Sequence, residues 1–313
     1  MQNRTRKLAI TEGITAGIFF GTAAIFVRFL PSLDAFSIAF WRLIVACGAL
    51  AILVIVLKRR LAVSIIGRNI MQLTILGALL ALHLIFFVSS VKDTTILNAT
   101  VLVNTAPIFS MLVSSFVYKK RPSRLALMGL IISFAGASII AFARAGPSNT
   151  MVTSTMKGNL EALLAAAVEA LYLNYGRKVR KQMDIISIML PIYLLSSLAI
   201  SIFSIPIAVE RLMLPTTLQI ILPLLGLGLL PTAIAHTLYF SSLADLKSFE
   251  TATMALIEPI GATLLGIVIF FEVPAWQFVF GAALVLLGVL FVIKKNKREE
   301  REVTLLLPQL SFP

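Results

Sequence analysis

The last two-fifths of this 313-residue chain repeat its middle at one fixed spacing. When the sequence is shifted by 152 positions, seven serine, aspartate, proline and glycine residues fall on identical residues. The matched pairs are Ser89 and Ser241, Ser90 and Ser242, Asp93 and Asp245, Pro107 and Pro259, Pro122 and Pro274, Gly129 and Gly281, and Gly136 and Gly288. The repeat predicts two similar halves. In a membrane chain, duplicated halves are typical of alternating-access carriers.

The composition indicates a membrane protein rather than a water-soluble one. The chain is 59% hydrophobic and 13% charged, with a mean hydropathy of +0.98, whereas a soluble domain carries about 25% charged residues. A net charge of +13 would suit a nucleic-acid binder, but the basic residues form short clusters between apolar runs. That distribution favours membrane topology and no nucleic-acid partner. The single cysteine, Cys47, cannot form an intramolecular disulfide.

Ten apolar segments are candidates for membrane spans, since a helical span needs about 20 apolar residues. They cover residues 13–30, 36–57, 70–91, 95–117, 125–143, 158–176, 185–208, 219–242, 249–271 and 275–293. We therefore expect an all-α membrane protein of ten transmembrane helices, five on each side of a polar stretch. The expected parts are a first repeat (1–143), an extracytoplasmic linker (144–157), a second repeat (158–293) and a basic cytoplasmic tail (294–313).

The basic clusters predict the orientation of these spans. With the N-terminus in the cytoplasm, 21 of the 27 lysine and arginine residues fall on the cytoplasmic side, which is the side that such residues favour. Both termini are then cytoplasmic, in a multi-pass protein of the cytoplasmic membrane. Because each half holds an odd number of spans, the second half starts on the opposite side from the first. The two five-helix repeats are therefore predicted to have inverted topology.

The repeated segments resemble the EamA-type repeat of the drug/metabolite transporter superfamily over nearly the whole chain. The motifs that carry the resemblance are Trp41-Arg42 in the second span, Glu258-Pro259 in the ninth, Glu272 and Pro274 at the next turn, and Gly281 and Gly288 in the tenth. The first copy keeps Pro107 and both glycines but has Thr105-Ala106 before the proline. The resemblance implies the fold and a transport activity. Families with this repeat move amino acids, nucleotide-derived metabolites, sugars and drugs.

Ionisable residues within the spans are candidates for the transport site, because an ionisable group at membrane depth costs about 2.5–3.5 kcal/mol or more. Glu258 lies near the predicted midplane directly before Pro259, and proline frees a backbone carbonyl one turn back. A carboxylate there suits a cation, a proton or an amine, or else a hydrogen bond between helices. Glu169 also lies near the midplane and shares a helix stripe with Glu161 and Tyr172, which we expect to face the bundle interior.

Arg42 lies about seven residues into the second span and permits three interpretations. Its long side chain could reach the interface, clamp a substrate carboxylate, or pair with a buried glutamate. His83 has aromatic neighbours one turn along, including Phe87, so it either serves the substrate or a proton or makes a helix–helix contact. His236, followed three residues later by Tyr239, permits the same two interpretations.

Asn104 lies near the midplane one turn before Pro107, where it could orient a polar substrate group or bond to another helix. The predicted substrate-binding residues are Trp41, Arg42, His83, Phe87, Asn104, Glu169, Tyr172, Tyr239 and Glu258. The candidates for coupling are Glu169, Glu258 and His83. The candidates for hinges are Pro107, Pro231 and Pro259, since proline interrupts helices.

Other function classes fit the sequence less well. The two histidines and one cysteine are widely spaced and form no HExxH or paired-cysteine set, and no GxSxG or phosphate-binding glycine motif is present. We therefore expect no enzyme activity, no metal and no cofactor. Nothing resembles the selectivity filter of an ion channel, and a purely structural protein would gain nothing from buried glutamates.

The sequence therefore predicts a secondary transporter, a monomer or weak dimer, whose partners are a small-molecule substrate and the lipid bilayer. One cationic clamp and carboxylates around a midplane cavity suit amino acids or related zwitterions. Export is expected by analogy with the family. The alternative is an exporter of cationic or amphipathic drugs that is proton-coupled through a buried glutamate.

Overall fold

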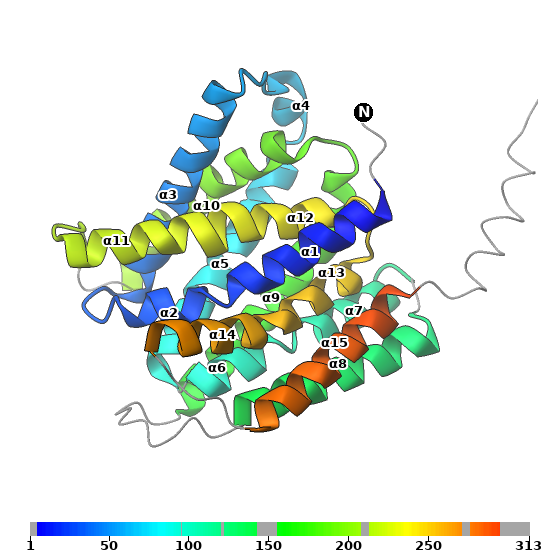
Figure 1. Ribbon diagram of the computed structural model, residues 1–313. Helices are drawn as coiled ribbons and strands as arrows, with labels where there is room; N and C mark the ends of the chain where they lie inside the picture. The colour runs from blue at the N-terminus through cyan, green and yellow to red at the C-terminus, as the bar shows by residue number, and fades with distance from the viewer. Residues whose placement is uncertain are drawn as a thin grey trace, which may run out of the picture.

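The computed structural model describes residues 5–94, 96–119, 122–142, 155–207, 213–270 and 276–294, and every regular element in these residues is helical (Figure 1). The predicted all-α class is therefore confirmed for the described part of the chain. Most of the predicted linker (144–157) and of the basic tail (294–313) lies outside the described residues, as do Glu272 and Pro274.

The helices follow one another without a change of architecture between the two halves. In the first half they are α1 (Arg6–Phe20), α2 (Ala23–Arg28), α3 (Ala35–Val56), α4 (Val63–Arg68), α5 (Ile70–Asp93), α6 (Ile96–Val103), α7 (Ala106–Phe116) and α8 (Arg124–Phe142). In the second half they are α9 (Met156–Arg180), α10 (Ile185–Ile207), α11 (Leu218–Leu227), a π-helical turn η1 (Gly228–His236), α12 (Thr237–Ser242), α13 (Ser248–Met254), a 3-10 turn η2 (Ala255–Ile257), α14 (Glu258–Phe270) and α15 (Trp276–Ile293).

Seven stretches of the described residues are helical, long and apolar enough to cross a membrane. They are Arg6–Arg28, Ala35–Val56, Ile70–Asp93, Asn98–Phe116, Ile185–Ile202, Leu218–Ser242 and Trp276–Ile293, with a shorter apolar helix at Arg124–Ile139. The predicted spans 158–176 and 249–271 correspond to α9 and α13–α14, outside this set. In α9, polar residues such as Glu161 and Glu169 lower the hydropathy. Large apolar side chains such as Ile55 and Phe116 are exposed, as a lipid-facing surface requires.

Helices α8 and α15 pack against each other through glycines of the repeat (Figure 1). A Cβ atom added to Gly129 would lie 2.6 Å from the Gly288 carbonyl oxygen, and one added to Gly136 would lie 2.6 Å from that of Gly281. The contacts are reciprocal, because Gly129 matches Gly281 and Gly136 matches Gly288 in the 152-residue shift. The two helices are thus antiparallel and almost in backbone contact, as small residues in membrane helices permit.

A second set of reciprocal contacts joins the starts of α3 and α10 to loops in the opposite halves of the chain. The Asp34 side chain caps α3, and Ser37 Oγ accepts a hydrogen bond from the Met213 amide, in the loop before α11, at 2.9 Å. Asp184 caps α10 by accepting from the Ser187 amide at 3.1 Å, and Ser187 Oγ accepts from the amide of Ala62, in the loop before α4, at 3.3 Å. Each helix start therefore holds a loop of the other half. The matching positions, Asp34 with Asp184 and Ser37 with Ser187, are 150 residues apart rather than 152.

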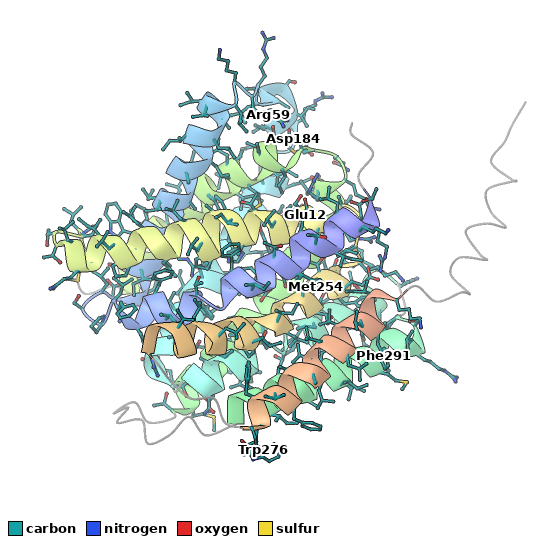
Figure 2. All side chains as sticks on the ribbon, viewed as in Figure 1. Glu12, Arg59, Asp184, Met254, Trp276 and Phe291 are labelled. Atoms are coloured by element: carbon teal, nitrogen blue, oxygen red, sulfur yellow. The ribbon has the colours of Figure 1, made fainter. Side chains whose placement is uncertain are left out.

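Helix α1 lies against the interrupted segment α13–η2–α14, where Figure 2 shows Met254 beside it. A Cβ atom on Gly13 of α1 would lie 2.7 Å from Met254 Cγ, and one on Gly21 would lie 2.5 Å from the Ala262 amide nitrogen. These glycines let α1 approach the backbone closely. This packing places the end of α1 beside Glu258, where α14 begins.

Candidate functional site

A cavity lies inside the helical bundle, and side chains from both halves line it. The polar lining residues are Arg42, His83, Asn104, Glu169, His236 and Glu258. The apolar lining residues are Phe20, Ala23, Leu84, Phe87, Val103, Ala106 and Ala255. The cavity thus combines a few polar groups with apolar walls, which is the usual composition of a small-molecule site.

Two interrupted helices each contribute a polar residue to the lining of the cavity. Asn104 lies in the break between α6 and α7, and Pro107 follows in the first turn of α7. In the second half, η2 ends directly before Glu258, which begins α14 and precedes Pro259. Two predicted hinge prolines therefore stand at helix interruptions, because proline has no amide hydrogen to donate to the preceding turn.

The third predicted hinge proline, Pro231, lies in the π-helical turn η1. Thr232 Oγ1 donates to the Leu227 carbonyl at 2.6 Å, and the Tyr193 hydroxyl donates to the Thr232 carbonyl at 2.8 Å. Side chains thus satisfy carbonyls of this turn. Short π-helical turns occur frequently at functional sites, and this one ends at His236 on the cavity wall.

Arg42 points into the bundle. The residue is only 1% exposed, its Nε donates to Thr232 Oγ1 at 2.9 Å, and its Nη1 has no hydrogen-bond partner among the described residues. This burial excludes the interpretation in which the side chain reaches the interface. No ion pair joins Arg42 to a carboxylate in the described part of the chain. The guanidinium of this cavity-lining residue therefore keeps one donor without a partner in the described part of the chain.

Two carboxylates line the same cavity and differ in their surroundings. Glu169 accepts a hydrogen bond from the Tyr239 hydroxyl at 2.8 Å, and its other oxygen lies 3.9 Å from His83 Nδ1. Glu258 is 8% exposed, and we find no hydrogen bond from another described side chain to its carboxylate. Tyr239 itself does not line the cavity but holds Glu169 from behind.

The two histidines lie side by side, with ring centres 6.0 Å apart. His83 Nδ1 is 3.1 Å from the Ala165 carbonyl oxygen. Because a carbonyl only accepts, Nδ1 of His83 is the donor in this contact. The ring of Phe87 stacks on His83 at 6.3 Å, and the edge of Phe20 meets His236 at 4.9 Å.

Three residues that line the cavity each have one buried nitrogen atom without a hydrogen-bond partner in the described part of the chain. These atoms are Arg42 Nη1, Asn104 Nδ2 and His236 Nδ1. A buried polar atom without a partner costs about 1–3 kcal/mol. A bound water or ligand that accepts hydrogen bonds would remove this cost, and a carboxylate has about four lone-pair sites for doing so.

Some predicted site residues lie away from the cavity. Trp41 Nε1 donates to the Met213 carbonyl at 2.8 Å and so anchors a loop. The Tyr172 hydroxyl faces Met189 Sδ at 3.9 Å, and its ring packs on Phe240. The expectation that Trp41 and Tyr172 line the cavity is therefore not met, because the rotation of each helix about its axis points Trp41 at the loop before α11 and Tyr172 at α10.

Glu161 lies near the start of α9 and does not line the cavity. Lys157 Nζ is 2.6 Å from Asp93 Oδ2 and 3.7 Å from Glu161 Oε1, and the Thr155 hydroxyl donates to the Asp93 carbonyl. The hydrogen bond to Asp93 raises the pKa of Lys157. These contacts join the end of α5 to the start of α9.

Within the described residues, no group of three or more histidine, cysteine, aspartate or glutamate side chains is placed to hold a metal ion. The cavity offers instead one guanidinium, one amide, two imidazoles and two carboxylates. Such a set has the chemistry to bind and orient a small molecule or to exchange protons with it, and none of its members is arranged as a nucleophile beside a general base.

Comparison with known proteins identifies the family. The sequence pattern of the EamA-like transporter family matches residues 7–142 and again residues 156–294. The chain belongs to this family. It is therefore a multi-pass transporter of the cell membrane rather than an enzyme.

The similar proteins match almost the whole of this chain. "Uncharacterized transporter YdfC" of Bacillus subtilis (strain 168) is 27% identical over 313 residues, which is 97% of each chain. An "Uncharacterized transporter" of Archaeoglobus fulgidus is 27% identical over 303 residues, covering 95% of this chain and 99% of its own. A solved structure titled "Crystal structure of protein" has a TM-score of 0.75 at 18% identity and covers 92% of this chain and 98% of its own. At that identity it supports the fold alone.

Proposed function

We propose that this protein is a ten-span secondary active transporter that exports amino acids or related zwitterions by alternating access around the cavity. The single observation that carries the proposal is that a guanidinium and two carboxylates line one cavity. Arg42, Asn104 and His236 present nitrogens without protein partners, while Glu169 and Glu258 present carboxylates. A zwitterion supplies the complement of both.

In this proposal the substrate carboxylate accepts hydrogen bonds from Arg42 Nη1 and Asn104 Nδ2. The substrate ammonium group donates to Glu258, with Glu169 beside it. Glu169 is already held by Tyr239, whereas Glu258 has no donor from a described side chain. Each charge-assisted hydrogen bond would contribute about 1.5–3 kcal/mol, and the opposed charges would orient the substrate.

The proposed topology has ten spans in two inverted halves, residues 1–143 and 158–293. The spans are α1–α2, α3, α5, α6–α7, α8, α9, α10, α11–α12, α13–α14 and α15. Reciprocal contacts support the inversion, since the glycine pairs of α8 and α15 exchange partners. Ser133 Oγ also contacts the carbonyl of Val285, its own counterpart in the 152-residue shift, at 3.3 Å. The basic clusters support cytoplasmic termini.

Movement in this proposal occurs at Pro107, Pro231 and Pro259. Helix interruptions at or beside all three residues support this role. Each proline also lies within a few residues of a polar lining residue, so bending there would change the cavity. Alternating access needs such coupling between the site and the gates.

Proton antiport through Glu258 is the proposed coupling, with Glu169 and His83 as its neighbours. A cavity carboxylate to which no described side chain donates can bind a proton and a cation in turn. An ammonium group entering the cavity would then displace the proton. The same feature supports the alternative substrate class, cationic or amphipathic drugs.

Counterflow in proteoliposomes tests the function. Vesicles are loaded with one unlabelled amino acid and assayed for accumulation of the labelled one, and separately with a lipophilic cation. We expect amino-acid accumulation that is lost in Arg42→Ala and retained in Glu161→Gln, a matched glutamate variant away from the cavity. Accumulation of the cation alone, unaffected by Arg42→Ala but lost in Glu258→Gln, would assign the protein to the drug exporters instead.

A further inference from the structure

Positions 152 residues apart in the sequence line the same cavity. Leu84 of α5 and His236 of η1 form one such pair, and Ala106 of α7 and Glu258 of α14 form another. In both pairs the first half supplies an apolar side chain where the second half supplies a polar one. The cavity is therefore chemically asymmetric even where its backbone positions correspond.

Three apolar lining residues of the first half pack together, and a fourth lies close to them in the sequence. Ala23 of α2, Phe87 of α5 and Val103 of α6 belong to one packed cluster of buried residues, and all three line the cavity. Ala106 lies three residues after Val103 and is 1% exposed. We call Ala23, Phe87, Val103 and Ala106 the apolar wall.

Both cavity carboxylates, Glu169 and Glu258, come from the second half. On the apolar wall itself no side chain carries a charge. A charged substrate group placed against it would lose its hydration without gaining a counterion, which is strongly unfavourable. An apolar group placed there would be removed from water at no such cost.

We infer that the transported zwitterion carries an uncharged, apolar side chain that lies against the apolar wall, and that Ala106 determines this selectivity. The inference rests on the proposed function. The charged backbone groups of the substrate occupy the Arg42 and Glu258 region, and the side chain occupies the wall. Amino acids with lysine-like or glutamate-like side chains are excluded for lack of a counterion.

The repeat itself suggests the decisive substitution, Ala106→Glu. Ala106 and Glu258 both stand in the first turn of a helix directly before a proline. The backbone at this position thus accommodates a glutamate in the second half. In the variant, a carboxylate would project from the apolar wall and provide the missing counterion for a basic side chain.

The test is counterflow of labelled leucine, phenylalanine, alanine, lysine and glutamate, each measured with the full-length protein in proteoliposomes. We expect leucine and phenylalanine to be taken up with at least about tenfold higher apparent affinity than lysine or glutamate, since pocket contacts discriminate by such factors. In Ala106→Glu, the apparent affinity for lysine should rise and that for leucine should fall, so that lysine is preferred to leucine.

A second variant protects the test against misfolding of the first. Phe87→Ala should lower the apparent affinity for phenylalanine and leucine by about tenfold and leave the apparent affinity for alanine little changed. Phe116→Ala, on the exposed face of α7 at 77% exposure, is the matched control and should change nothing.

Each contrary outcome points to one specific error. If lysine or glutamate is preferred by the unmodified protein, the transport of zwitterions stands and the apolar side-chain subsite is wrong. The subsite is also wrong if neither Ala106→Glu nor Phe87→Ala changes the order of substrates. If no labelled amino acid accumulates at all, the proposed function is wrong and the inference falls with it.

Discussion

Replacing Gly136 of α8 by alanine is predicted to destabilise the protein, although alanine favours a helix by about 1 kcal/mol over glycine. The new Cβ atom would lie 2.6 Å from the Gly281 carbonyl oxygen and 2.7 Å from the Val285 amide nitrogen. Cβ atoms essentially never approach other atoms closer than 3.0 Å. Backbone atoms of α15 would therefore have to move by several tenths of an ångström. Overpacking of this kind costs about 1–3 kcal/mol.

Gly48→Ala of α3 is the matched control, because a Cβ atom there meets nothing within 4 Å. Both glycines lie within helices, so the gain in helix propensity is shared and the difference between the variants isolates the clash. Thermal unfolding in detergent should show a midpoint for Gly136→Ala several degrees below that of the unmodified protein. The midpoint of Gly48→Ala should be equal or higher. Equal midpoints for the two variants would refute the close packing of α8 on α15.

Two further predictions concern polar contacts. Tyr239→Phe removes the hydroxyl that donates to Glu169 and should raise the KM for counterflow about 10-fold or more. The control is Tyr172→Phe, which should leave the KM unchanged because the Tyr172 hydroxyl faces the sulfur atom of Met189. An unchanged KM in Tyr239→Phe would mean that Glu169 is not part of the site. Asp93→Asn should lower stability by no more than about 1 kcal/mol, because Lys157 is exposed. Asp93 raises the pKa of Lys157, so the difference in stability between Asp93→Asn and the unmodified protein should be present at neutral pH and vanish as the pH rises through that pKa. Thermal unfolding at a series of pH values measures this difference. A difference that grows at alkaline pH would contradict the pairing.

The sequence predicts the helical segments well because hydropathy is averaged over about 20 residues, so single errors matter little. It also brings out the residues whose position in a membrane is costly. Arg42, Glu169 and Glu258 are ionisable groups in apolar surroundings, and all three line the cavity. The physical reason is general, since such groups are tolerated only where partners or a cavity receive them.

The rotation of each helix about its axis is much harder to predict. Trp41 precedes Arg42 in the sequence, yet its side chain points to a loop rather than to the cavity. Tyr172 follows Glu169 by about one helical turn, yet it faces Met189. A difference of a few tens of degrees decides which of two neighbouring residues faces the cavity, and tertiary packing sets that angle.

Apart from Phe87, the apolar lining residues could not be predicted from the sequence. Ala23 and Val103 look like ordinary members of an apolar span, and only their position in the fold assigns them to the cavity. His236 lines the cavity although it is not among the predicted substrate-binding residues, and it follows a glycine- and proline-rich segment. That segment forms the π-helical turn η1, which ends at this residue.

Binding of a zwitterion between Arg42 and Glu258 is tested most directly by substrate analogues that lack one charge. Counterflow of labelled leucine is measured in competition with leucine, its methyl ester, and 4-methylpentanoate, the analogue without the amino group. Both analogues should compete at least about tenfold more weakly than leucine. In thermal unfolding of the purified variants, the ester should stabilise Arg42→Ala as well as leucine does, and 4-methylpentanoate should stabilise Glu258→Gln as well as leucine does. Equal competition by all three compounds with the unmodified protein would contradict the proposed site.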